Sequence, residues 1–181
     1  LDDKRHGAFV LGPGFGDLEK ARQFVSLLGD KVVVLDADAI TAFKDCPETL
    51  FDRVISGAGK FVLTPHEGEF ARLFPDLAAD TSLSKIEKAQ TASARSGAVL
   101  VYKGADTVIA TPDGHALVNT NAPSSLATAG SGDVLAGIIG ALLAQGTPAF
   151  EAAAAGVWLH GVAGSRAGAG MTAEDLAHSV R

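Results

Sequence analysis

Short apolar runs alternate with helical patterns through the first part of this chain. Val32–Leu35 is continuously apolar, which is typical of a parallel strand covered on both sides. Similar strands are expected at Ala8–Leu11, Phe61–Leu63 and Val99–Tyr102. Helices are expected between them at Asp17–Leu28, at about Glu67–Phe74 and at Ser84–Ser96. Repeated strand–helix units predict an α/β sandwich with a largely parallel sheet.

The later residues carry a different pattern. Two short strands, Val108–Ala110 and Ala116–Asn119, flank the turn-forming Pro112–Gly114, so an antiparallel hairpin is expected to finish the sheet. Apolar residues at helical spacing then predict a helix, and their positions are Val134, Leu135, Ile138, Ile139, Leu142 and Leu143. An Ala-rich helix is expected over about Pro148–Ala167. Thr172 and Asp175 resemble a capping box for a last short helix.

Composition narrows the class of protein. The chain has 181 residues, which fits one domain, and a net charge of −6, which gives no reason to expect a nucleic-acid surface. No apolar run reaches membrane-spanning length. Cys46 is the single cysteine and is expected to be inert, so a reducing, cytoplasmic location is predicted. The segment Leu1–His6 runs directly into a strand, and the chain is therefore expected to be the later part of a longer domain.

A glycine-rich loop, Gly130–Asp133, precedes the apolar helix. Small residues let a ligand approach the backbone, and the free N–H groups of a helix N-terminus favour an anion. A carboxylate there has an obvious role as general base toward a hydroxyl that attacks a phosphoryl group. The alternative is a tight turn in which Asp133 only stabilises the first helical turn, and a lone motif of this kind does not decide between them.

Other polar segments follow the carboxyl ends of the expected strands, where open α/β sheets bind ligands. With Gly130–Asp133 they could form one pocket, and they are Gly12–Gly16, Asp36 with Asp38, Thr64–Glu69 and Lys103–Thr107. Each segment also has a structural interpretation. Asp38 could cap a helix, Asp36 and Lys103 could face water, and His66 could merely start a helix.

The remaining histidines suggest no chemistry. His160 lies on the Ala-rich helix and is interpreted as packing or hydrogen bonding, while His6, His115 and His178 are expected at the surface. No pair of histidines has metal-ligand spacing with a cysteine or carboxylate, so no transition-metal site is predicted.

Together the motifs closely resemble those of the ADP/ATP-dependent NAD(P)H-hydrate dehydratases, a family of the ribokinase-like superfamily. In order, they are Gly12–Gly16, Asp36–Ala39, Leu63–Glu69, Lys103–Thr107 and Ala129–Asp133. The resemblance implies a ribokinase-like three-layer α/β/α sandwich with a mostly parallel central sheet. Residues 1–181 would be about the C-terminal two-thirds of that domain, with its N-terminal part missing.

The resemblance also implies a reaction. The family restores hydrated NADH or NADPH to NADH or NADPH by phosphorylating the ring hydroxyl and then eliminating phosphate. Mg²⁺ and ADP or ATP are the implied cofactor and co-substrate, with ADP favoured. A homo-oligomer, a tetramer in the family, is implied, and so is an NAD(P)HX epimerase as a fused or separate partner.

The resemblance also implies roles for the residues of this sequence that match the family's motifs. Asp133 is implied as catalytic and, with Gly14 and His66, as contacting the hydrated dinucleotide. The nucleotide would be held by Lys103, Gly104, Ala105, Asp106, Thr107 and Gly132. The anion hole would be formed by Gly130, Ser131 and Gly132. A water-mediated Mg²⁺ role is open for Asp36 and Glu69. Ser131 stands where Thr is common in the family, which keeps the hydroxyl.

Two alternatives remain at this point. One is a small-molecule kinase of the same superfamily, such as a hydroxyethylthiazole kinase, in which phosphate stays on the product. The other is a nucleotide-binding fragment without activity. The Thr64–Glu69 and Lys103–Thr107 segments favour the dehydratase.

Overall fold

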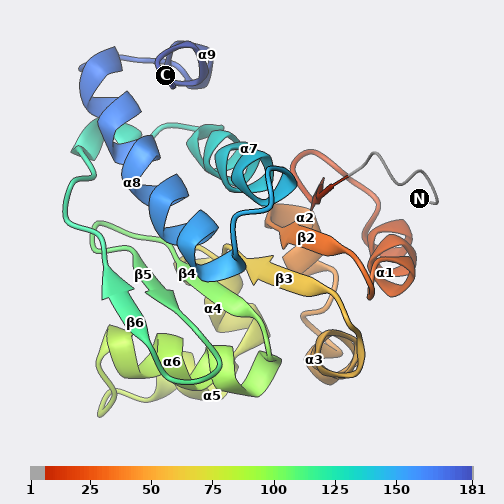
Figure 1. Ribbon diagram of the computed structural model, residues 1–181. Coiled ribbons are helices and arrows are strands. Elements are labelled where there is room, and N and C mark those ends of the chain that lie inside the picture. The colour runs from red at the N-terminus through yellow and green to blue at the C-terminus, as the bar shows by residue number, and fades with distance from the viewer. Residues whose placement is uncertain (1–6, 181) are drawn as a thin grey trace.

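A six-stranded sheet forms the centre of the computed structural model, which describes residues 7–180 (Figure 1). Its strands lie in the order of the sequence: β1 (Phe9–Leu11), β2 (Val32–Leu35), β3 (Lys60–Leu63), β4 (Val99–Tyr102), β5 (Val108–Ala110) and β6 (Ala116–Val118). The first four strands are parallel, and β5 and β6 are antiparallel to their neighbours. The prediction of a mostly parallel sheet that ends in a hairpin is confirmed.

Helices connect the parallel strands and follow the hairpin. They are α1 (Leu18–Leu27), α2 (Ala37–Thr41), α3 (Pro47–Ser56), α4 (Glu67–Leu73), α5 (Pro75–Ala79), α6 (Lys85–Ser96), α7 (Ser131–Ala144), α8 (Ala149–Ala167) and α9 (Ala173–His178). A 3₁₀ turn spans Ser124–Leu126. The helices α2, α3 and α5 have no counterpart among the sequence predictions. In α3, Pro47 starts the helix, and Leu50, Phe51 and Val54 form its buried side.

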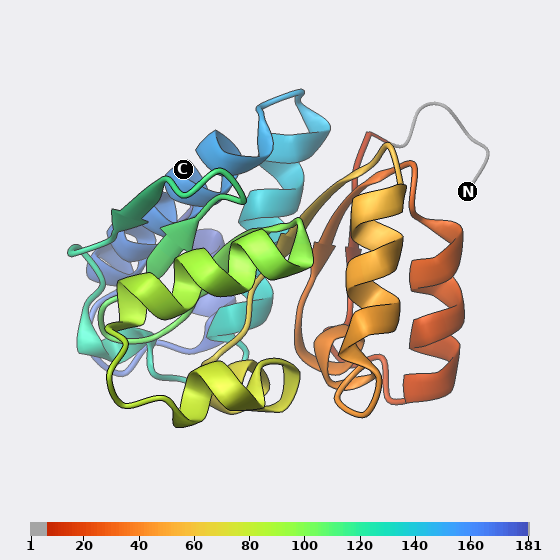
Figure 2. The ribbon, with the colours of Figure 1, turned by 90° about the horizontal axis from the view of Figure 1, so that it is seen from below.

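The sheet has helices on both faces, as Figures 1 and 2 show. Side chains of β2 alternate between the two sides: Val33 and Leu35 join the core beneath α1, α3 and α6, and Val34 joins the core beneath α7 and α8. Burial on both faces is the reason that the strand is apolar throughout. The expected three-layer sandwich is therefore confirmed.

Hydroxyl side chains cap the N-termini of two helices. Ser84 caps α6, and Thr172 caps α9, each in a reciprocal capping box with an acidic residue, Glu87 and Asp175 respectively. The predicted Thr172–Asp175 box is thus confirmed. These caps fix where each of the two helices begins.

Within residues 7–180, the cysteine and the histidines expected at the surface do not line the cavity described below. His115 and His178 are exposed, as predicted, and Cys46 is partly buried just before α3, while the prediction for His6 falls outside the described residues. Over residues 7–180, no helix is both long and apolar enough to cross a membrane.

Candidate active site

The carboxyl ends of the parallel strands are joined by backbone hydrogen bonds. The Asp36 N–H donates to the Leu11 carbonyl at 3.1 Å, and the Thr64 N–H donates to the Leu35 carbonyl at 3.1 Å. The Lys103 N–H donates to Pro65 O at 2.9 Å. The segments that follow these strands are therefore held at one edge of the sheet, as the alternating pattern predicted.

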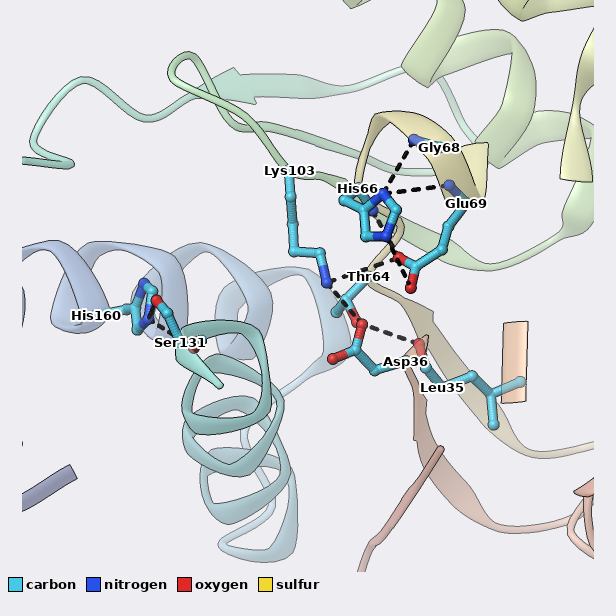
Figure 3. A network of polar contacts seen from close by, with 9 residues as sticks. All are labelled: Leu35, Asp36, Thr64, His66, Gly68, Glu69, Lys103, Ser131 and His160. Atoms are coloured by element: carbon cyan, nitrogen blue, oxygen red, sulfur yellow. Dashed lines mark hydrogen bonds and ion pairs between the residues drawn. The ribbon is translucent and has the colours of Figure 1, made fainter. Parts of the chain in front are cut away.

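A buried ion-pair cluster lies at this edge. Lys103 Nζ is 2.7 Å from Asp36 Oδ1 and 3.8 Å from Glu69 Oε2 (Figure 3). The Asp36 side chain is 2% exposed and that of Lys103 is 17% exposed. The water-facing interpretation of these two residues is wrong, because each compensates the charge of the other inside the fold.

Asp38 binds backbone rather than capping a helix. Its Oδ2 accepts a hydrogen bond from the Gly16 N–H at 2.8 Å, which ties the Gly12–Gly16 turn to the end of β2. Gly12 has a φ of 127°, and a Cβ on it would lie 1.7 Å from the Asp36 carbonyl oxygen. Only glycine fits this approach. The alternative that Asp38 is a cap is wrong, because Asp38 lies inside α2 and the N-cap position is that of Asp36.

His66 starts helix α4, and its imidazole is part of a capping box. Its Nδ1 accepts hydrogen bonds from the Gly68 N–H at 3.0 Å and from the Glu69 N–H at 3.3 Å. Its Nε2 lies 3.3 Å from Glu69 Oε1. Because Nδ1 accepts, Nε2 is the nitrogen that carries the proton in the neutral ring. The half-exposed imidazole thus presents an N–H beside the Lys103 cluster.

Helix α7 points its N-terminus at the same cluster. Gly130, just before the helix, has a φ of 81°. A Cβ on Gly132 would lie 3.3 Å from Lys103 Nζ and 3.7 Å from Asp36 Oδ2. Within residues 7–180 the Gly132 N–H has no hydrogen-bond acceptor. A free N–H beside an ammonium group is an arrangement that attracts an anion.

The Lys103–Thr107 segment is a tight turn between β4 and β5. The Thr107 hydroxyl donates to the Gly104 carbonyl at 3.0 Å, and the Gly104 N–H approaches the same hydroxyl oxygen at 3.3 Å. Lys85 of α6 holds the outside of the turn, because its Nζ lies 2.8 Å from Asp106 Oδ1 and 3.4 Å from the Lys103 carbonyl. The turn is therefore fixed in shape from both sides.

A cavity of about 760 Å³ unites these parts. Eight of the residues predicted for the site line it: His66, Lys103, Gly104, Ala105, Thr107, Ser131, Gly132 and Asp133. Asp36, Glu69 and Asn119 line it too, and the loop that leads into α7 contributes Ala122–Ser124 and Leu126–Thr128. Gly14, Asp106 and Gly130 are outside the lining. Such a volume suits a small-molecule ligand.

His160 of α8 reaches the cavity wall and holds the first residue of α7. Its Nε2 is 3.0 Å from the Ser131 carbonyl oxygen and 3.1 Å from Ser131 Oγ (Figure 3). Both residues are buried. Burial lowers the pKa of His160 below its usual value, and the positive charge of Lys103 lowers this pKa further. His160 therefore stays neutral at neutral pH, and its predicted hydrogen-bonding role is confirmed.

Comparison with known proteins decides the family. A family model described as NAD(P)H-hydrate dehydratase matches residues 1–181. The chain belongs to this family. The ADP-dependent (S)-NAD(P)H-hydrate dehydratase of Neisseria meningitidis serogroup B is 42% identical over 187 residues, which cover 96% of this chain and 60% of that protein. The bifunctional NAD(P)H-hydrate repair enzyme Nnr of Gloeobacter violaceus is 42% identical over 98% of this chain and 35% of its own length.

Solved structures of the family have the same fold. The ADP/ATP-dependent NAD(P)H-hydrate dehydratase of Bacillus subtilis, co-crystallised with ATP/Mg²⁺, matches with a TM-score of 0.81 at 30% identity, over 96% of this chain and 62% of that chain. A ribokinase-like superfamily protein of Enterococcus faecalis V583 matches with a TM-score of 0.74 at 27% identity. The predicted ribokinase-like fold is confirmed. The chain spans less than two-thirds of the length of these relatives.

The carboxylates that line the cavity do not form a metal-binding site by themselves. Across the described part of the chain, no group of three or more His, Cys, Asp or Glu side chains could hold a metal ion. Asp36 and Glu69 both approach Lys103 Nζ. These two carboxylates would therefore contact a Mg²⁺ ion only through water.

Several lining residues have no counterpart among the sequence predictions. Asn119 was expected only as the last residue of a strand, and the loop over residues 122–128 carries no helix or strand pattern, so no periodicity indicated a site role for either. His160 had an available signal. It follows Ala153 and Val157 on the buried face of α8, and a polar side chain on such a face needs a polar partner.

Proposed function

We propose that this chain carries out the ADP-dependent dehydration of hydrated NADH and NADPH to NADH and NADPH. One observation carries the proposal. Asp133, Lys103 and the free N–H of Gly132 line the same cavity as His66. This set supplies a base, a phosphate-binding cation and an anion site within a fold that the family uses for this reaction.

The proposed reaction has two balanced steps. The ring hydroxyl oxygen attacks the terminal phosphorus of ADP, the bond from that phosphorus to the bridging oxygen breaks, and AMP leaves. Asp133 takes the hydroxyl proton. In the second step the bond between ring carbon and phosphate oxygen breaks, phosphate leaves with the electron pair, and the departing phosphate takes a proton from the neighbouring ring carbon. The ring double bond re-forms. Phosphorylation is needed because hydroxide is a poor leaving group and phosphate is a good one.

Each remaining residue has a binding or stabilising role in this proposal. Lys103 and the free backbone N–H of Gly132, in the first turn of α7, stabilise the charge on the transferring phosphoryl group. The turn from Lys103 to Thr107 holds the adenine nucleotide. Gly14 and His66 contact the hydrated dinucleotide, with His66 offering the N–H at Nε2. Bound Mg²⁺ would neutralise phosphate charge and orient the phosphates.

Recovery of absorbance at the reduced-nicotinamide band tests the proposal. The chain is mixed with hydrated NADH or NADPH, Mg²⁺, and either ADP or ATP. The expected result is recovery with ADP, with one inorganic phosphate released for each reduced ring. A small-molecule kinase would instead keep the phosphate on its product. Nucleotide binding with no recovery under any of these conditions would refute the proposal for this chain.

A further inference from the structure

The contact between His160 and Ser131 fixes where protons lie. The Ser131 carbonyl oxygen can only accept, so the His160 Nε2 that lies 3.0 Å from it must carry a proton. The same N–H faces Ser131 Oγ at 3.1 Å. The hydroxyl oxygen therefore accepts from His160, and its own proton must point elsewhere.

That hydroxyl proton has no acceptor in the part of the chain that the structure describes. Ser131 Oγ makes its recorded contact with His160 alone, and Ser131 lines the cavity at the N-terminus of α7. Its neighbour Gly132 lies next to Lys103 Nζ, where a phosphate would be drawn. A buried hydroxyl donor without an acceptor, beside an anion site, points to an acceptor that arrives with the ligand.

We propose that the Ser131 hydroxyl donates a hydrogen bond to the phosphoryl group in transit, and that His160 is the positioning residue that directs this proton into the cavity. The inference rests on the proposed phosphoryl transfer and adds a side-chain donor to its backbone anion site. His160 touches no reacting atom and acts through Ser131. Its neutral ring suits this role, because the N–H at Nε2 donates to Ser131 and its proton is not transferred to the substrate.

Substitutions of the serine test the donor. Ser131→Ala removes the hydroxyl, and Ser131→Thr keeps it. Loss of one preorganised donor to a developing anion lowers kcat by about 100-fold or more. We expect Ser131→Ala to show that loss with a nucleotide KM within a few-fold of wild type, and Ser131→Thr to keep most of the rate. An unchanged kcat in Ser131→Ala would overturn the proposal.

Substitutions of the histidine test the positioning role. Gln places an amide N–H near the position of Nε2, so His160→Gln should recover much of the kcat that His160→Leu loses. The double variant Ser131→Ala/His160→Leu should be no slower than Ser131→Ala, since the histidine acts through the hydroxyl. Fully multiplicative losses in the double variant would refute this dependence. His115→Gln, an exposed histidine outside the cavity, is the matched control and should leave kcat unchanged.

A binding measurement separates this inference from the proposed function. Aluminium fluoride with AMP or ADP mimics a phosphoryl group in transit, and its affinity can be measured by calorimetry without turnover. Ser131→Ala should weaken binding of the mimic by at least 10-fold while binding of the nucleotide alone changes little. If the wild-type chain lacks dehydratase activity but shows this difference, the substrate assignment fails and the donor role stands. Equal affinities for the mimic in both proteins would overturn the donor role.

Discussion

Replacing Lys103 by Met should cost both stability and nucleotide binding, and the two losses can be separated. Lys103 lies 2.7 Å from Asp36, whose side chain is 2% exposed. Removing one partner of a buried pair leaves the other charge uncompensated and costs about 3–5 kcal/mol. Taking about 3 kcal/mol, and about 2–4 °C per kcal/mol for a chain of this size, Tm should fall by about 6–12 °C.

The double variant Asp36→Asn/Lys103→Met separates the two losses. With both charges of the close pair gone, Asp36 no longer leaves a buried charge uncompensated, and Glu69 keeps the hydrogen bond from the His66 N–H at 2.8 Å, so most of the lost unfolding free energy should return. Nucleotide affinity should stay low, because the ammonium group that meets the phosphates is still absent. Urea unfolding measures the first quantity, and calorimetric titration with ADP and ATP measures the second.

Two results would refute this reasoning. A loss below about 1 kcal/mol in Lys103→Met, the value expected of an exposed ion pair, would mean that water already compensates Asp36. Recovery of nucleotide affinity in the double variant would mean that Lys103 affects nucleotide binding only by neutralising the charge of Asp36. Lys44→Met is the matched control, because Lys44 is exposed and makes no recorded ion pair within residues 7–180.

Three further predictions concern the base, the helix start and pH. Asp133→Asn should abolish cofactor recovery and largely spare nucleotide binding by calorimetry, since Asp133 is exposed in the cavity without a structural partner among the described residues. Gly130→Ala should lower the unfolding free energy in urea by about 1–2 kcal/mol, because Gly130 has a φ of 81° and a Cβ there would lie 2.9 Å from Ala173 Cβ. Gly137→Ala, in the open interior of α7, should not destabilise the protein. The hydrogen bond from Arg95 lowers the pKa of Asp76 from 3.8 to about 2, so the stability that it adds is present above pH 3.8 and is lost as pH falls through about 2. The difference in urea stability between wild type and Arg95→Gln should accordingly shrink between these pH values.

Much of the fold could be predicted because local pattern and tertiary environment agree. The strands at Val32–Leu35, Val99–Tyr102 and Val108–Ala110 have the predicted bounds, since each is apolar at every position and buried on both faces. Helix α3 has a weaker signal. Its start is a proline and its buried side holds only Leu50, Phe51 and Val54, so its amphipathic pattern is short.

The position of the site could be predicted from topology, whereas its internal pairing could not. Alternation of strands and helices places Asp36 and Lys103 at one sheet edge, but nothing local to either residue indicates that they pair across 67 positions of sequence. A carboxylate that follows a strand can be exposed to solvent or buried beside a cation. The register of β3 between β2 and β4 decides the matter, because it brings the ends of those strands close enough for Lys103 to reach Asp36.

The same reasoning explains why a histidine on an apolar helix belongs to a polar site. His160 occupies a position of α8 that packs toward α7, and burial there without a partner would cost about 1–3 kcal/mol. The partner is the first residue of the glycine-rich helix start, where small side chains leave the backbone carbonyl within reach. The small side chains that would let a phosphate approach the start of α7 therefore also let the His160 imidazole reach the Ser131 carbonyl. Rigidity and ligand access at Ser131 thus have a common origin in the small residues that precede α7.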